Sequence, residues 1–197
     1  LSGRSDTALE GYRKALKEIQ ESQKNLVEEA EFGLARNLSS LSEIRTEQSP
    51  EALKELQTFI EKHADGRFYY AALLQLGDLR IRMKKFSEAT LEFRKLKDSE
   101  VGSYPLQGEL GLARIALAQK KYPEAKSSLQ AVLDTPFKGL LISRIQQEAR
   151  VGLAAADELP DDPLAPQRGP GLERRAPRRG RHHHAARVGG VHLLSHQ

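Results

Sequence analysis

The feature that most constrains the fold of this 197-residue chain is a pattern of apolar and small residues that returns after 36 positions. Self-similarity at a fixed period of this length is typical of helical repeat arrays. The matched positions are Leu76 and Leu112, Phe86 and Tyr122, Ala89 and Ala125, Phe93 and Leu129, and the dilysines Lys84–Lys85 and Lys120–Lys121. We therefore expect a row of similar structural units.

Each unit is predicted to be a hairpin of two helices. In the first of the two matched units, apolar residues recur at helical spacing up to Met83, the chain breaks at Lys84, and a second apolar set begins at Phe86. Gly77 lies inside the first helix, where glycine costs about 1 kcal/mol relative to alanine. We expect a neighbouring helix to approach closely at this glycine.

A short motif places the units along the chain. Gly33-Leu34-Ala35-Arg36 returns unchanged as Gly111-Leu112-Ala113-Arg114, with a third echo in Gly152-Leu153-Ala154, so we assign all three to equivalent first helices. The predicted domain spans residues 1–159 and has about seven helices. Its units are the half unit 5–24, the hairpins 25–64, 68–98 and 105–134, and the half unit 139–159. Unpaired terminal helices predict uncovered apolar faces at both ends.

These residues resemble the tetratricopeptide repeat (TPR) family in a divergent form. Gly77, Phe86, Ala89 and Phe93 occupy its Gly, Tyr, Ala and Phe positions, whereas Arg80 stands where the family favours Tyr. The resemblance implies an all-α fold, an α-solenoid in which TPR-like helical hairpins form a right-handed superhelical stack. It also implies that the first helices line a concave face.

In the family, defined positions of the first helices face a bound partner. Carried over to this sequence, the groove positions of that kind are Phe32, Arg36, Leu74, Asp78, Arg82, Leu110 and Arg114. The resemblance implies that they bind a peptide or helix of another protein. For Leu74 and Leu110, packing between helices is an equal alternative.

Candidate catalytic and metal-binding residues are sparse. The chain has no cysteine, and His63 is the single histidine before residue 182, close to a predicted helix end where the helix dipole favours a cation. No nucleophile motif such as G-x-S-x-G accompanies His63. The acidic residues Glu28, Glu29 and Glu31 splay around a predicted helix and indicate a solvated face. We expect no enzyme activity, no cofactor and no metal site.

The last residues differ in kind. Residues 1–158 contain 24 acidic and 24 basic side chains, so their net charge is zero and predicts no electrostatic attraction of nucleic acid. Residues 160–197 are rich in Pro, Gly, Arg and His and contain no Lys, which predicts a disordered tail or an altered, out-of-frame end. The adjacent histidines His182–His184 lack the spacing of a preformed metal site. No aromatic residue lies within Arg174–Arg181 to stack on bases, so no specific nucleic-acid binding is expected.

The sequence therefore favours a non-catalytic scaffold or adaptor with a protein or peptide partner. The alternative is a self-associating module, a homo-oligomer that uses the uncovered terminal faces. The first residues, LSGRSD, are neither an initiator Met nor a signal peptide, which suggests a fragment or a processed form. The stretch from Phe59 to Leu79 resembles bacterial envelope proteins of this class. That resemblance implies a membrane tether through a preceding segment and a role in secretion or outer-membrane assembly. It favours a periplasmic or inner-membrane-anchored location over a cytoplasmic one.

Overall fold

The computed structural model describes residues 2–19, 23–136 and 139–158. The chain divides into two units, residues 1–163 and 164–197, and all described residues belong to the first. The predicted tail, 160–197, lies outside the described residues.

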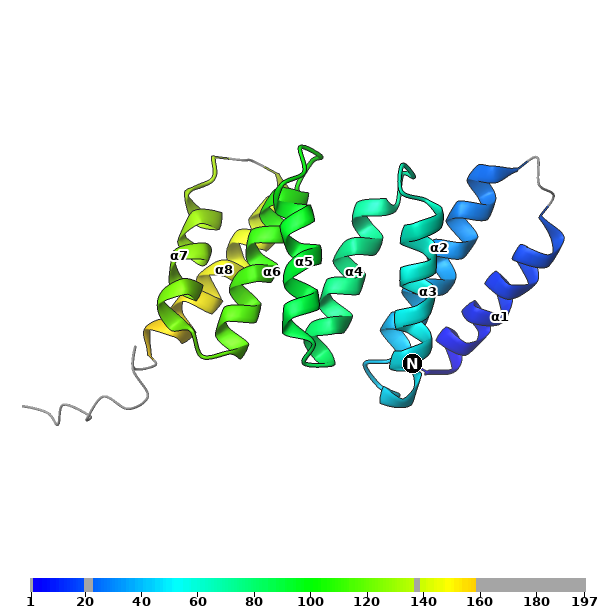
Figure 1. Cartoon of the computed structure of the whole chain (residues 1–197), viewed down its shortest axis with the longest axis horizontal. Coiled ribbons are helices and arrows are strands. Elements are labelled where there is room, and N and C mark those ends of the chain that lie inside the picture. Colours follow the sequence, from blue (N-terminus) through cyan, green and yellow to red (C-terminus); the bar gives the residue numbers. More distant parts are fainter. Residues whose placement is uncertain (1, 20–22, 137–138, 159–197) are drawn as a thin grey trace, which may run out of the picture. The chain divides into compact units, whose positions relative to one another are not determined.

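The described residues form eight α-helices and one 3-10 helix, with no strand among them (Figure 1). The bounds are α1 Ser2–Glu18, α2 Lys24–Leu41, η1 Thr46–Gln48, α3 Ser49–Lys62, α4 Tyr69–Arg82, α5 Phe86–Lys97, α6 Tyr104–Ala118, α7 Tyr122–Asp134 and α8 Leu140–Asp157. The all-α prediction is confirmed. The count of about seven helices was too low by one, and α1 begins three residues before the predicted boundary at residue 5.

Helices that follow one another in the sequence pack against one another throughout, from α1 on α2 to α7 on α8 (Figure 1). A second set of contacts joins α2 to α4, α4 to α6 and α6 to α8. Within the described residues, the backbones of α1, α3, α5 and α7 do not approach each other in this way, although the side chains of Arg13 on α1 and Glu51 on α3 form an ion pair. The even-numbered helices, which are the predicted first helices, therefore form a continuous layer.

Glycines let the helices approach closely, as expected for Gly77. A Cβ built on Gly77 of α4 would lie 2.8 Å from the ring of Phe93, and one on Gly111 of α6 would overlap the same ring. Phe93 of α5 is thus held between the two neighbouring first helices. The motif glycines make similar contacts, because Tyr12 of α1 packs against Gly33 and Leu129 of α7 packs against Gly152.

The recurring dilysine marks a helix C-terminus of one type. Lys84 and Lys120 have positive φ angles of 59° and 60°. In each turn the following amide, of Lys85 or Lys121, donates a hydrogen bond to the carbonyl five residues earlier, at 2.8 and 2.9 Å. This is the Schellman motif, which usually has glycine at the positive-φ position. The two hairpins therefore share their turn geometry as well as their sequence pattern.

The core is built of three clusters, one spanning α1 to α4, one α4 to α6 and one α6 to α8. Between α4 and α5 it also holds a charged pair, because Nη1 of Arg80 lies 2.5 Å from Oε1 of Glu92 and both residues are buried. Nε of Arg80 is buried without a hydrogen-bond partner.

The two ends of the helical row differ. The described side chains of α1 expose no large apolar residue, and Leu9 is buried, so the expectation of an uncovered face at that end was wrong there. Tyr12 of this helix packs against Gly33 of α2. On α8, by contrast, Leu140 and Val151 are exposed.

Candidate functional site

The predicted groove residues form one stripe on each first helix. Residues four apart lie on the same face of a helix, which aligns Leu74, Asp78 and Arg82 on α4 and Leu110 with Arg114 on α6. The stripes of neighbouring helices meet, because side chains from one reach the next. The structure thus brings Asp78, Arg82 and Arg114 together on the layer of first helices.

Arg82 connects α4 to α2. Its Nη2 donates hydrogen bonds to the carbonyl oxygen and to Oγ of Ser39, both at 3.1 Å, and its Nη1 lies 3.3 Å from Oε1 of Glu43. Ser39 is buried, so the guanidinium reaches the edge of the core. Arg82 therefore contributes to helix packing in addition to presenting a charge.

Arg114 connects α6 to both of its neighbours in the layer. Its Nη1 lies 2.7 Å from Oδ1 of Asp78 on α4, and its Nε lies 3.8 Å from Oε1 of Glu148 on α8. Burial raises the pKa of the Asp78 carboxyl above its usual value, although the charge and hydrogen bond of Arg114 and the charge of Arg82 act to lower it. Asp78 is thus a partly desolvated carboxylate that depends on Arg114 for compensation.

Two predicted residues lie in the core. Phe32 is 6% exposed and its ring stacks on Phe68 at 4.8 Å between centroids, while Leu110 is 6% exposed within the α6 to α8 cluster. Both side chains have little surface left for a partner. For Leu110 the structure favours the alternative of packing between helices.

Two other predicted residues are accessible. Arg36 is exposed, lies 5.9 Å above the Phe32 ring and makes no ion pair with any described residue. Leu74 is half-buried at the edge of the α4 to α6 cluster. The accessible part of the predicted surface therefore combines an arginine without an ion pair among the described residues and one half-buried leucine, beside the paired charges of Asp78 and Arg114.

The acidic cluster on α2 has a role that the sequence did not indicate. Oε1 of Glu28, a buried residue, accepts a hydrogen bond from the amide of Phe68 at 3.1 Å. Oε2 of Glu31 lies 2.5 Å from Nε2 of His63, and Lys62 also pairs with Glu31. Glu28 and Glu31 thus hold the connection from α3 to α4. The interpretation of the cluster as a solvated face was wrong for these two residues.

His63 caps the end of α3, where it was expected, and its close partner is a carboxylate. Burial alone would raise the pKa of Glu31, but the hydrogen bonds and charges of Lys62 and His63 outweigh it and lower that pKa below its usual value. In the described part of the chain, no group of three or more His, Cys, Asp or Glu residues could hold a metal ion.

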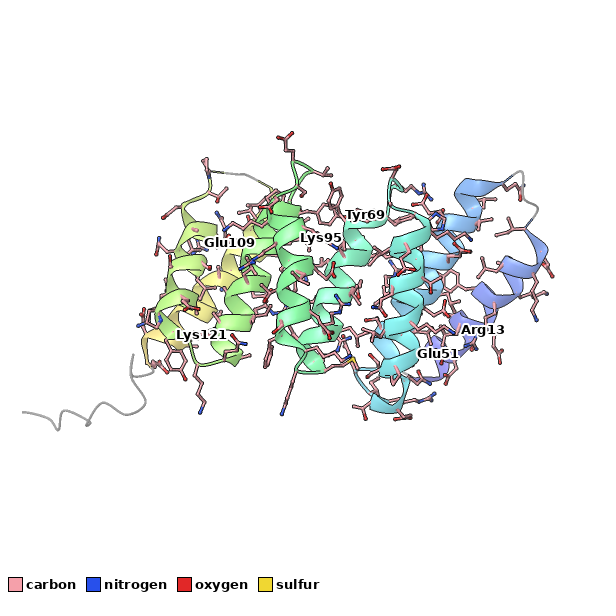
Figure 2. The ribbon with its side chains drawn as sticks, in the orientation of Figure 1. Arg13, Glu51, Tyr69, Lys95, Glu109 and Lys121 are labelled. Atoms are coloured by element: carbon pink, nitrogen blue, oxygen red, sulfur yellow. The ribbon has the colours of Figure 1, made fainter. Side chains whose placement is uncertain are left out.

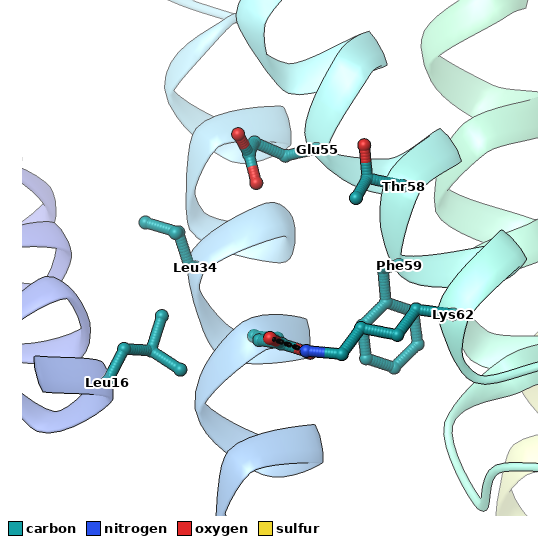
Figure 3. A pocket seen from close by; sticks show the side chains of 7 residues that line it. Leu16, Leu34, Glu55, Thr58, Phe59 and Lys62 are labelled. Carbon is teal, nitrogen blue, oxygen red and sulfur yellow. Dashed lines mark hydrogen bonds and ion pairs between the residues drawn. The ribbon is translucent and has the colours of Figure 1, made fainter. Parts of the chain in front are cut away.

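The described surface has pockets of different sizes. One pocket of about 160 Å³ lies over α2 between α1 and α3 (Figure 3), lined by Leu16, Glu31, Leu34, Glu55, Thr58, Phe59 and Lys62. A related pocket of about 220 Å³ lies over α6 between α5 and α7, with Leu112 at the place of Leu34. Both are below the roughly 300–1,000 Å³ typical of small-molecule sites. A third, of about 380 Å³, lies at the lower end of that range and includes Arg82 beside η1 and the start of α3.

Comparison with known proteins finds no family model, curated protein or solved structure that matches the chain. None of the helices in the described ranges combines the length and the hydrophobicity that crossing a membrane requires.

Proposed function

We propose that residues 2–158 form a right-handed solenoid of TPR-like hairpins that acts as a non-catalytic scaffold or adaptor. The observation that carries this proposal is the close packing of α2 with α4, α4 with α6 and α6 with α8, while the backbones of the described second helices stay apart and α1 reaches α3 through the side chains of Arg13 and Glu51. Helices that are closer together on one side of a row curve the row toward that side. The first helices then line the inner surface, where a peptide or helix of the partner binds.

The charge and apolar surface of the first helices suggest which side chains a partner segment has. Arg36 is an exposed cation without an acidic partner among the described residues, and Leu74 offers apolar surface. A segment with a carboxylate and an apolar side chain complements both. Arg114 contributes less to recognition, because Asp78 already engages it at 2.7 Å. The resemblance to envelope proteins adds the proposal that the partner belongs to secretion or outer-membrane assembly.

Charge reversal tests the surface. We expect Arg36→Glu to weaken capture of the partner about tenfold or more while the far-ultraviolet circular dichroism spectrum stays unchanged. Arg94→Glu is the matched control, because Arg94 is an exposed arginine that belongs to the second helix α5, lines the pocket between α5 and α7, and also lacks an ion pair with described residues. Arg82 and Arg114 are poorer targets, since reversing them also breaks contacts between helices.

Site-specific photocrosslinking in the native host supplies a second readout. A benzoylphenylalanine at Ala118, exposed one turn after Arg114, should crosslink the partner, whereas the same group at Thr58 on α3 should not. Equal loss of capture in the two charge-reversal variants, or crosslinking from Thr58 alone, would place the partner outside the first-helix layer.

A further inference from the structure

The pocket of about 220 Å³ over α6 corresponds to a part of the core that is filled one hairpin earlier. On α6 and α7 its lining includes Ala116, Glu124 and Ser128. One repeat of 36 residues earlier, the same positions hold Arg80, Glu88 and Glu92. In that hairpin Nη1 of Arg80 lies 2.5 Å from Oε1 of Glu92, and its Nε lies 3.6 Å from Oε2 of Glu88. The pocket therefore stands at the place of a buried ion pair.

The pocket has short side chains where the earlier hairpin has long ones. Position 116 is alanine in place of Arg80, and position 128 is serine in place of Glu92. The acidic residue at the rim is kept, because Glu124 corresponds to Glu88. The earlier hairpin thus shows that this place in a unit can hold a glutamate carboxylate, and the later hairpin leaves the place open.

The charges around the pocket are not balanced. In the earlier hairpin each of the two carboxylates pairs with Arg80 and with one lysine. Arg94 on α5 and Lys121 at the start of α7 line the pocket over α6, and neither makes an ion pair with any described residue. Two cations therefore face one carboxylate, that of Glu124, where the earlier hairpin has two carboxylates.

The start of α7 favours negative charge at the same point. Lys121 is the residue before this helix, and no described side chain accepts a hydrogen bond from the first amides. Unpaired amides and the positive end of the helix dipole both attract an anion. The helix end thus acts in the same direction as the two cations.

We propose that the pocket over α6 holds the carboxylate of a glutamate side chain from a second protein. Arg94 and Lys121 supply the opposite charges, and Leu112 and Ile115 in the lining suit the methylene groups of that side chain. A volume below that of small-molecule sites fits one side chain better than a free metabolite. One added carboxylate brings the cations and Glu124 to the charge balance of the earlier hairpin.

This site is separate from the first-helix surface. Leu112 and Arg114 are two residues apart, and a helix has about 3.6 residues per turn, so their side chains point to different sides of α6. The proposal therefore does not depend on the partner proposed for Arg36 and Leu74.

The absence of cysteine from the sequence allows the pocket to be probed with tethered fragments. Gln119→Cys places one thiol at the exposed rim. The full-length variant is equilibrated with disulfides of mercaptobutanoate, mercaptobutanamide or aminobutanethiol in excess mercaptoethanol, and intact mass spectrometry measures the labelled fraction. We expect the carboxylate to label about fivefold more than the amide, and the ammonium to label least.

The control measures attraction of charge at an open surface. Gln147→Cys lies on α8 three residues from each of the exposed arginines Arg144 and Arg150. A carboxylate preference at position 119 no larger than at position 147 would overturn the proposal. Inorganic phosphate should not cancel the preference beyond a chloride control of equal ionic strength. Cancellation by phosphate would assign the pocket to a free anion instead of a side chain.

Variants at Arg94 and Arg36 separate this site from the first-helix surface. Arg94→Gln, added to Gln119→Cys, should reduce the carboxylate preference to that of the control position. Arg36→Glu should leave the preference unchanged, and Arg94→Glu should leave capture at the first-helix surface unchanged. A preference that survives Arg94→Gln would contradict the proposed role of Arg94.

The pocket can also be filled from within the chain. Ser128→Glu gives position 128 the residue of position 92 and should abolish the carboxylate preference at position 119. Ser128→Gln is the control of matched size. Ser128→Glu should have the higher urea midpoint of the two, because Arg94 and Lys121 pair with its carboxylate. A midpoint at or below that of Ser128→Gln, with an unchanged circular dichroism spectrum, would show that the pocket does not stabilise a carboxylate.

Discussion

Removing one partner of the buried pair Arg80–Glu92 should lower the free energy of unfolding far more than removing both partners. Two unit charges about 4 Å apart attract by about 4 kcal/mol at an effective dielectric constant near 20. Desolvation costs several kcal/mol for each ion, so the net contribution of the pair is close to zero. A single substitution, however, leaves the remaining charge in the core without its main partner, which typically costs about 3–5 kcal/mol.

The surroundings place the expected cost at the lower end of that range. Glu92 also contacts Lys95 at 3.3 Å, and Nε of Arg80 lies 3.6 Å from Glu88. We therefore expect Arg80→Met and Glu92→Leu each to lower the free energy of unfolding by about 3 kcal/mol. The double variant should come within about 1 kcal/mol of the wild type or exceed it, because two apolar side chains then fill the site.

Urea denaturation followed by circular dichroism measures these four proteins as a double-mutant cycle. The expected coupling energy is about 5 kcal/mol. The ion pair between Arg13 of α1 and Glu51 of α3 is the control (Figure 2), since its atoms are 3.0 Å apart but both side chains are half-exposed. Its coupling should stay below about 1 kcal/mol. A coupling at Arg80–Glu92 as small as that of the control would refute the argument from burial.

Three further predictions use the same denaturation measurement. Gly108→Ala should lower the free energy of unfolding by about 3 kcal/mol, because its Cβ would overlap the backbone of Lys97. Gly11→Ala, whose Cβ would have no atom within 4 Å, should raise the free energy of unfolding by about 1 kcal/mol. Equal effects of the two substitutions would contradict the close approach of α5 and α6. Lys84→Gly should be about 1 kcal/mol more stable than Lys84→Ala, since residue 84 has a φ of 59°, and the reverse order would exclude a strained turn. Glu31→Gln should be less stable than the wild type at pH 7, because the lowered pKa of Glu31 means that its ionised form stabilises the fold. The difference in free energy of unfolding between the two proteins should vanish as the pH falls through that pKa. A difference that persists at about pH 2 would show that the loss is not electrostatic.

Local pattern was sufficient to predict the helices. Apolar spacing and the dilysine breaks each depend on residues within a few positions of each other, so the predicted hairpins 25–64, 68–98 and 105–134 agree closely with the bounds of α3 to α7. The close approach at Gly77 also followed from the cost of glycine in a helix.

Contacts between distant segments were not predictable in the same way. Arg82 and Arg114 were selected by their repeat positions, but their partners Ser39 and Asp78 lie 43 and 36 residues away. Nothing in the local sequence distinguishes a cation that binds a ligand from one that bridges two helices. The buried position of Glu28 was missed for the same reason, because its partner is a backbone amide in the next hairpin.

The matching turns at Lys84 and Lys120 have a consequence for how the chain can change in length. Each ends a first helix with the same backbone geometry, 36 residues apart, so the segment between them begins and ends in equivalent conformations. Duplicating or deleting that segment would join two turns of the same backbone conformation and leave both flanking turns intact. The hairpin before these turns is longer and includes η1, so this equivalence belongs to the segment between the two turns and not to every unit of the row.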